Sequence, residues 1–446
     1  MNSPRFACGW WLCGVLALAL ALRVGACAWW QSRLPAGANF AFGDSDTYWT
    51  LARELAAGRA FQYGSPDARV FRTPGYPLLL APLFLINDQP SVMWGRWLSA
   101  VCGTLAVAGV YALAARLFDR HTALLAAALA AVYPGAIAMS VVVLSEAPFC
   151  PLVAAQLATW VASWRTLRGN RCPPATHGGQ CPPYASESSA LTPSGEWRSL
   201  LWAAASGGLG GLATLMRPSW LLFIPFAVLA GLVLSDRRRR MLSGGLVMLA
   251  ALVAVMLPWW VRNARVVGHF VPTTLQVGAS LYDGLNPRAD GSSRMDFVAP
   301  FEQIERREDA ASDEPFEYRL DRRLRQAALD WAAGHPKKVA RLAVVKFIRL
   351  WNLWPNDPRQ RGGLMRWVSA AAYLPMLVLA LVGIWRTHGR WWPAAVCWLP
   401  AVYLTLLHVV FVSSIRYREP AMLGLIVLAA SVFSKRTKEC PRSTAS

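Results

Sequence analysis

Charged residues are scarce in this sequence, and acidic residues are the scarcest. Only 16% of the 446 residues are charged, against roughly 25% in a typical soluble chain. Hydrophobic residues make up 55%, which is more apolar surface than a soluble chain of this length has interior to bury. The composition therefore excludes a disordered chain, a secreted disulfide scaffold and a cytosolic enzyme, and it indicates a multi-pass membrane protein.

The shortage of acidic residues leaves a large positive charge. Forty-five Lys and Arg face 25 Asp and Glu, a net charge of +20. In a soluble protein this excess would suggest a nucleic-acid partner. In a membrane protein, cytoplasmic anchoring and anionic membrane lipids account for it. We therefore expect membrane lipids as partners, and no nucleic acid.

The cysteines and histidines provide little basis for a metal site. Most of the nine cysteines lie in or beside apolar runs, where cysteine behaves as a small hydrophobic residue. Cys172 and Cys181 flank His177 in a polar loop, but their spacing matches no zinc pattern. We expect idle thiols there.

Apolar stretches long enough to cross a bilayer, which takes about 20 residues each, dominate the chain. They predict an all-α polytopic membrane protein with about ten transmembrane helices, at residues 8–30, 92–117, 121–141, 143–163, 199–216, 218–234, 241–261, 365–385, 391–412 and 419–434. No repeat of domain size is visible among them.

The basic residues of the short loops predict the orientation. With ten spans, five clusters fall on one side: Arg116 and Arg120; Arg165, Arg168, Arg171 and Arg198; residues 237–240; Arg386 and Arg390; and Lys435, Arg436 and Lys438. That side is expected to be cytoplasmic, with both termini in the cytoplasm, 435–446 as a cytoplasmic tail, and the protein in the cell (plasma or inner) membrane. Alternatively, Ala26-Cys27-Ala28 marks the cleavage site of a signal peptide. Either way, segments 31–91 and 262–364 lie outside.

The remaining segments differ in composition. Residues 166–197 are rich in Pro, Gly and Ser without an apolar period, so we expect a disordered cytoplasmic insertion without a catalytic role. Residues 262–300 read as a loop. Residues 301–354 read as amphipathic helices on the outer leaflet.

Two carboxylates stand just outside the first span. Asp44 and Asp46 precede a helix expected over residues 47–57. In the structural interpretation, they complement the helix dipole, and Asp44 or Ser45 caps the helix. In the functional interpretation, they form a general base or a cation site for a phosphorylated ligand.

Further polar residues gather at the outer helix ends. Arg72 and Tyr76 precede a short apolar run, 78–86, which is expected to lie half-buried along the interface. Arg72 there either meets a phosphate or extends to the headgroups. Glu146 opens a span, either as a helix N-terminal residue or as a functional group in the membrane.

Four arginines share this outer side: Arg217, Arg262, Arg416 and Arg418. Each alone is explained by headgroup anchoring. Together with the three carboxylates they indicate a phosphate site, because a guanidinium binds two phosphate oxygens in one plane. A phosphate site at the membrane surface suggests a lipid-phosphate substrate.

These motifs, in this order, resemble a known family. The chain contains D-S-D-T-Y-W-T-L-A-R-E-L-A-A-G, R-T-P-G-Y-P-L-L-L-A, L-S-E-A-P-F, L-M-R-P, P-W-W-V-R-N-A-R-V-V-G-H-F-V-P-T-T and R-Y-R-E-P. It resembles bacterial lipid-linked-sugar glycosyltransferases of the GT-C fold, in particular family 39, with the protein O-mannosyltransferases, and the aminoarabinose transferases. The resemblance covers residues 8–434 except the insertion, and so makes 1–434 one domain.

The resemblance implies an activity and roles for residues. Such enzymes pass a sugar from a polyprenyl phosphate to an acceptor hydroxyl on a lipid, glycan or protein outside the membrane. It implies Asp44 as catalytic base with Asp46 alongside, and donor binding by the remaining candidates: Arg72, Tyr76, Glu146, Arg217, Arg262, Asn263, Arg416 and Arg418. A divalent metal at 44–46 stays open. Segment 301–341 is too short for the soluble domain of some relatives, which leaves the acceptor open.

Three alternatives remain from the sequence. A transporter or flippase of lipid-linked sugars also has many helices with intramembrane charge, but such proteins show internal repeats and broken midplane helices. An oligosaccharide polymerase or ligase would take a lipid-linked glycan as donor. A non-enzymatic scaffold would tolerate acidic substitutions at Arg217 or Arg262.

Overall fold

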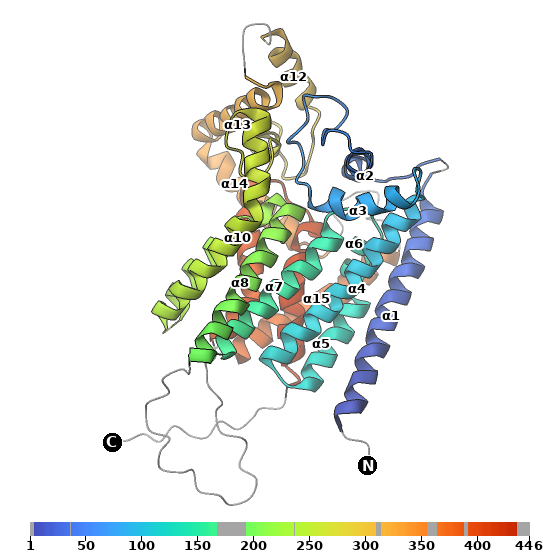
Figure 1. The fold of residues 1–446 in the computed structure, drawn as a ribbon, viewed down its shortest axis with the longest axis vertical. Helices are drawn as coiled ribbons and strands as arrows, with labels where there is room; N and C mark the ends of the chain where they lie inside the picture. Colours follow the sequence, from blue (N-terminus) through green and yellow to red (C-terminus); the bar gives the residue numbers. More distant parts are fainter. Residues whose placement is uncertain are drawn as a thin grey trace, which may run out of the picture.

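The computed structural model describes residues 4–35, 37–166, 193–235, 237–308, 314–354, 364–387 and 391–434. Across these residues all regular structure is helical. A bundle of long helices carries shorter helices at one end (Figure 1). Most of the expected insertion and the tail 435–446 lie outside the described residues, as do Cys172, His177 and Cys181. Residues 193–197, expected in the insertion, instead begin a bundle helix.

All ten expected apolar stretches are helical. They form α1 (Pro4–Arg33), α4 (Val92–Leu117), α5 (Arg120–Val132) with α6 (Pro134–Ser140), α7 (Glu146–Thr166), α8 (Pro193–Met216), η1 (Pro218–Trp220) with α9 (Phe223–Leu234), α10 (Arg238–Val267), α15 (Leu364–Arg386), α16 (Trp391–Val410) and α17 (Glu419–Ser431). Five helices of the described residues are long and apolar enough to cross a membrane, or six when α5 and α6, bent by 58°, count as one span. The all-α membrane fold is confirmed, while helix length alone supports fewer than ten spans.

Prolines set the breaks in the shorter elements. A residue before proline is driven out of the helical region, and Tyr133 and Arg217, which precede Pro134 and Pro218, are both extended. The chain therefore leaves the helix at Arg217, so that this side chain stands at a helix end rather than on a helix face.

Helix α17 forms the centre of the bundle. All 13 of its residues are buried. Close packing needs small residues: a Cβ on Gly424 would lie 2.0 Å from the Cys397 carbonyl oxygen of α16. On the other side, a Cβ on Gly383 of α15 would lie 2.1 Å from the Leu428 carbonyl oxygen. Because both neighbours hold α17 tightly, the turn that precedes it has a fixed position.

The outer layer consists of α2 (Gly43–Ala56), α3 (Gly75–Ile86), α11 (Val277–Gly284), α12 (Val298–Arg307), α13 (Phe316–Gly334) and α14 (Pro336–Leu350), with η5 (Ile415–Arg418) beneath it. Figure 1 shows α3 lying across the upper end of the bundle, as expected, with α2 above it. The start of α3 is seated on the end of α8, where a Cβ on Gly75 would be 2.6 Å from the Leu215 carbonyl oxygen.

Three details of the outer layer differ from expectation. Helix α2 begins at Gly43, so Asp44 and Asp46 occupy its first turn, and its N-cap is Phe42 without a side-chain cap. Helix α10 continues to Val267, and α11 lies in a stretch expected to be a loop. In each case tertiary contacts order a segment that its local sequence leaves undecided.

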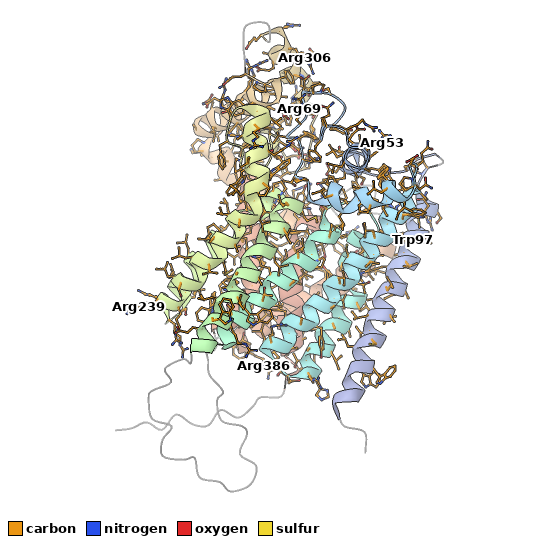
Figure 2. The ribbon with its side chains drawn as sticks, viewed as in Figure 1. Arg53, Arg69, Trp97, Arg239, Arg306 and Arg386 are labelled. Carbon is orange, nitrogen blue, oxygen red and sulfur yellow. The ribbon has the colours of Figure 1, made fainter. Side chains whose placement is uncertain are left out.

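The arginines of the short loops and those of the outer layer lie at opposite ends of the molecule. Figure 2 shows Arg239 and Arg386, from the short loops, at the end opposite Arg53, Arg69 and Arg306. The short-loop clusters that the structure describes thus share one end. That this end faces the cytoplasm stays a prediction.

Glu317 connects α13 to the segment before α3, and its raised pKa predicts that the stability of the protein depends on pH. Its carboxylate accepts hydrogen bonds from the backbone N–H groups of Arg69 and Val70 at 3.2 and 3.1 Å. Burial raises its pKa from 4.5 to about 7. Because the folded state then holds a proton that the unfolded state releases, the stabilising contribution is complete below pH 4.5 and is lost as pH rises through 7.

We expect wild-type protein to lose up to about 3 kcal/mol of stability between pH 4.5 and 7 from this group. Glu317→Gln, which cannot ionise, should lack that part of the loss. Melting temperatures at pH 5 and pH 8 for both proteins measure it, with Glu302→Gln as a charge-matched control. Equal pH dependence in wild type and Glu317→Gln would contradict the prediction.

Candidate active site

Asp44 lies where the outer layer meets the bundle. Arg72 Nη2, from the turn before α3, is 2.5 Å from Asp44 Oδ1. Arg416 Nη2, from η5, is 3.5 Å from Oδ2. The Asp44 side chain is still 36% exposed, so an incoming group has access to this carboxylate.

Glu146 is the buried counterpart of Asp44. It opens α7, and its side chain is only 3% exposed. A buried carboxylate needs charged partners, and Glu146 has two: Arg217 Nη1 is 2.6 Å and Arg416 Nε is 3.7 Å from its Oε1 atom. The extended conformation of Arg217 at the end of α8 makes the shorter contact possible.

The two carboxylates and three arginines form one continuous chain, which runs Arg72, Asp44, Arg416, Glu146, Arg217. The elements that supply it are far apart in sequence, so the chain is a product of the fold. Three guanidinium groups face two carboxylates, which leaves one positive charge uncompensated within the cluster. Such a cluster can accept a singly charged anion, and arginine forks suit phosphate oxygens.

Tyr417 completes the cluster, although the sequence analysis did not assign it a role. Its hydroxyl accepts a hydrogen bond from Arg416 Nη2 at 2.9 Å. Its ring lies 4.8 Å from the Arg416 guanidinium and 5.4 Å from that of Arg217. The His408 ring stacks on the Tyr417 ring, with the ring centres 4.5 Å apart. Its place between two arginines of the R-Y-R motif is the only signal in the sequence.

Asp46 faces away from the arginine cluster. Tyr63 donates its hydroxyl hydrogen to Asp46 Oδ2 at 3.1 Å, and the Tyr63 ring stacks on Phe71. The two carboxylates of the D-x-D motif therefore have different partners. In the part of the chain that the structure describes, no three His, Cys, Asp or Glu side chains gather around a possible metal position.

Tyr76 is close to the cluster but does not face it. Its hydroxyl pairs with that of Ser99 at 3.3 Å, and the residue is 1% exposed. Its ring packs edge-on against Tyr48 at 5.2 Å. Tyr48 in turn donates its hydroxyl hydrogen to Ser145, next to Glu146. Tyr76 thus packs against Tyr48, whose partner Ser145 precedes Glu146, and the substrate contact expected from its motif stays a prediction.

Arg262, Asn263 and Arg418 lie outside the chain of charges. Arg262 donates to the carbonyl oxygens of Arg69 and Phe61 at 2.8 and 3.1 Å. Asn263 is fully buried, and its amide donates to the Val271 carbonyl. Arg418 donates to the carbonyl of Leu350 and lies 3.6 Å from the centre of the Tyr373 ring. Each of these side chains donates hydrogen bonds to backbone carbonyl oxygens, and its expected role in donor binding stays a prediction.

A substitution at Arg262 distinguishes a role in holding the backbone from a role in ligand binding. Arg262→Gln removes two charge-assisted hydrogen bonds that hold the loop before Arg72. We expect the free energy of unfolding to fall by about 1.5–3 kcal/mol per bond, which a lower melting temperature would show. Binding of an anion to the arginine cluster of the folded fraction should be unchanged. A selective loss of anion binding without loss of stability would instead place Arg262 at the bound anion.

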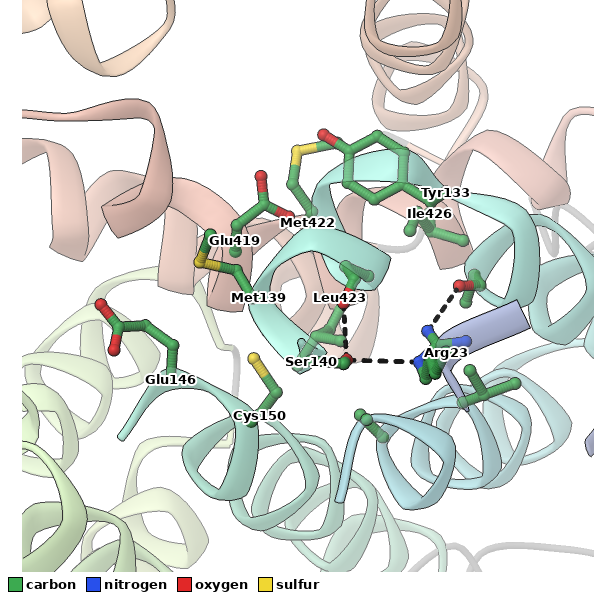
Figure 3. A pocket seen from close by; sticks show the side chains of 16 residues that line it. Arg23, Tyr133, Met139, Ser140, Glu146, Cys150, Glu419, Met422, Leu423 and Ile426 are labelled. Atoms are coloured by element: carbon green, nitrogen blue, oxygen red, sulfur yellow. Dashed lines mark hydrogen bonds between the residues drawn. The ribbon is translucent and has the colours of Figure 1, made fainter. Parts of the chain in front are cut away.

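A small cavity lies between Glu146 and the middle of the bundle (Figure 3). Its volume is about 20 Å³, enough for about one water molecule. Arg23 of α1 lines it, donating to Ser140 at 3.3 Å and to the Ala131 carbonyl at 3.1 Å. Arg23 therefore fastens α1 to the bent pair of α5 and α6.

Arg23 and Glu419 were not predicted from the sequence as site residues. Glu419, at the start of α17, lines the same cavity, and its buried Oε2 atom has no hydrogen-bond partner among the described residues. The available signal was the presence of an ionisable residue inside an apolar stretch, which is costly in a membrane and marks a structural or functional contact.

Comparison with known proteins agrees with the resemblance found in the motifs. The sequence profile of the dolichyl-phosphate-mannose-protein mannosyltransferase family matches residues 71–171. No curated protein matches the chain by sequence. The matched segment contains Arg72 and Glu146 of the charge chain.

Solved structures of an archaeal oligosaccharyltransferase show the same fold at low identity. The archaeal oligosaccharyltransferase AglB from Archaeoglobus fulgidus, in complex with an inhibitory peptide and a dolichol-phosphate, is 16% identical with a TM-score of 0.55, covering 95% of this chain and 50% of that one. Its apo form is 18% identical with a TM-score of 0.56 and the same coverage. ArnT from Cupriavidus metallidurans bound to undecaprenyl phosphate is 16% identical with a TM-score of 0.43, covering 94% and 77%. The chain spans about half the length of the oligosaccharyltransferase whose fold it shares.

Proposed function

We propose that this protein is a membrane glycosyltransferase that moves a sugar from a polyprenyl-phosphate donor to an acceptor hydroxyl on the side of α2 and α3. The observation that carries the proposal is Asp44, a partly exposed carboxylate held between Arg72 and Arg416 at the membrane surface. Three further findings support it: the shared fold, the family profile over residues 71–171, and the uncompensated positive charge of the cluster.

The donor phosphate binds to the arginines of the cluster. A polyprenyl-phosphate sugar is a phosphodiester with one negative charge, which matches the one positive charge that the cluster leaves uncompensated. Arg416 contacts both carboxylates only at 3.5 and 3.7 Å, so it can turn toward a phosphate at little cost. Its departure from Asp44 leaves that carboxylate freer to accept a proton.

The reaction is an inverting displacement. Asp44 removes the proton of the acceptor hydroxyl while the hydroxyl oxygen attacks the anomeric carbon. The bond between that carbon and the phosphate oxygen breaks, and the polyprenyl phosphate leaves with the electron pair. Its charge grows from one toward two as the bond breaks, and guanidinium donors already in place stabilise that charge in the transition state.

The acceptor is a hydroxyl of a lipid, a glycan or a protein. The outer helices α12 to α14 stand beside α2 (Figure 1), and we propose that they bound the space where the acceptor binds. A divalent metal near residues 44–46 is tested by carrying out the reaction with a chelator and then with Mg²⁺ or Mn²⁺.

The test is a reaction of purified protein in vesicles with polyprenyl-phosphate sugars and candidate acceptors. We expect release of free polyprenyl phosphate and a product heavier by one sugar, detected by mass spectrometry. A comparison of the lipids of cells with and without the protein identifies the natural donor and acceptor. Movement of a labelled donor across the vesicle membrane without cleavage would favour a flippase instead, and cleavage only of donors with a long glycan would favour a polymerase or ligase.

A further inference from the structure

A second cavity opens at the end of the bundle opposite the charge chain, between α7, α8 and α10. It is lined by Trp160 and Trp164 from α7, Glu196 from α8, and Arg240 and Gly244 from α10. Its volume is about 230 Å³, far above the roughly 10–15 Å³ that one water needs. The cavity therefore has room for a polyatomic group.

The two charged side chains of this cavity are available to a ligand. Among the described residues, Arg240 and Glu196 form no ion pair with each other or with another side chain. They come from different helices but line the same space. A cavity with one cation and one anion that do not neutralise each other by contact fits a ligand that carries both charges.

The place of the cavity near the ends of α8 and α10 fits the depth of lipid headgroups. Gly244 is six residues beyond the start of α10 at Arg238, which corresponds to about 9 Å along the helix. Glu196 lies in the first turn of α8. The bilayer interface occupies roughly 5–8 Å on each side of the hydrocarbon core, and tryptophan is favoured at that level. Arg239, next to Arg240, is at this end of the molecule (Figure 2).

We propose that this cavity binds the headgroup of a zwitterionic phospholipid with a primary amine, such as phosphatidylethanolamine, in the leaflet opposite the charge chain. Arg240 binds the phosphate, and Glu196 accepts hydrogen bonds from the ammonium group. A purely anionic headgroup would form an ion pair with Arg240 but would be repelled by the Glu196 carboxylate. A choline headgroup has no N–H to donate to Glu196. Basic pockets between helices are known lipid sites, and the added carboxylate makes this one selective.

The helix backbone offers a way to close the cavity without changing its charge. A Cβ built on Gly244 has no heavy atom within 4 Å, so a larger side chain there enters open space instead of displacing a neighbour. Gly244→Leu also replaces a poor helix former by a good one. This variant therefore blocks the cavity while α10 stays intact.

The experiment is native mass spectrometry of the full-length protein, released from nanodiscs of equal parts phosphatidylcholine, phosphatidylethanolamine and phosphatidylglycerol. We expect wild-type protein to retain phosphatidylethanolamine roughly tenfold over phosphatidylglycerol, about the effect of one charge-assisted hydrogen bond. Arg240→Gln and Gly244→Leu should lose the retained lipid. Glu196→Gln should reverse the preference toward phosphatidylglycerol.

Arg239→Gln provides the matched control, because it removes the same charge from the neighbouring residue, which does not line the cavity. It should retain lipid as the wild type does. Retention of phosphatidylglycerol at or above phosphatidylethanolamine by the wild type would overturn the proposal, as would equal retention by Gly244→Leu. Lipid retention involves no sugar transfer, so this measurement tests the lipid site independently of the proposed enzymatic activity.

Discussion

Asp44→Asn is expected to slow sugar transfer by roughly 100- to 10,000-fold, the usual contribution of a general base. Asparagine keeps the size of the side chain and one oxygen for Arg72, but it cannot take the proton of the acceptor. The loss should therefore appear in kcat, with donor binding largely retained. Single-turnover measurements of polyprenyl phosphate release, with donor saturating, isolate this step.

Asp46→Asn is the matched control on the same helix turn. Asp46 bonds to Tyr63 at 3.1 Å and not to the arginines, so its replacement should cost about fivefold or less, the value of one ordinary hydrogen bond. A loss equal to that of Asp44→Asn would show that both carboxylates act together, for example on a cation. Full activity in Asp44→Asn would remove that residue from the mechanism.

Arg416→Gln is expected to lower transfer by roughly 100- to 1,000-fold, because it removes a donor placed where negative charge develops. The protein should still fold, since Asp44 keeps Arg72 at 2.5 Å and Glu146 keeps Arg217 at 2.6 Å. Binding of free polyprenyl phosphate should weaken in parallel. Measuring both the equilibrium binding and the rate separates phosphate recognition from a general loss of structure.

Two further substitutions serve as controls for the effect of Arg416→Gln. Arg53→Gln removes a charge from an exposed side chain on the same outer face, and it should change neither binding nor rate. Arg217→Gln leaves the buried Glu146 with only the 3.7 Å contact to Arg416, and loss of a partner from a buried pair costs about 3–5 kcal/mol. That variant should therefore fold poorly. Unchanged phosphate binding in Arg416→Gln would place the phosphate elsewhere.

The helices were largely predictable from the sequence because each apolar stretch must satisfy its backbone inside the membrane, and a helix does so locally. The same reasoning could not predict how many stretches cross it. Residues 121–141 form two helices because of Pro134, and α17 is short and entirely enclosed by neighbouring helices. The break at Pro134 follows from the local sequence, whereas the enclosure of α17 depends on contacts between elements.

The composition of the candidate site was also predictable in part. Asp44, Glu146, Arg72, Arg217 and Arg416 were all singled out from their motifs, and the fold brings these five together. Arg262 and Arg418 have the same features in the sequence, as arginines at outer helix ends. Only the structure separates them, because their side chains turn toward backbone carbonyls instead.

By itself, then, the sequence determined the membrane environment, the helical class and the set of polar residues at the outer helix ends. The reason is physical: the cost of exposing backbone and charge to lipid acts on each segment independently. The tertiary structure alone decided which charges meet. Partners such as Asp44 and Arg416 are 372 residues apart in the chain, and their contact depends on the packing of α17 and the placement of α2. The structure likewise brings Arg240 and Glu196 to one cavity, which no local pattern predicts.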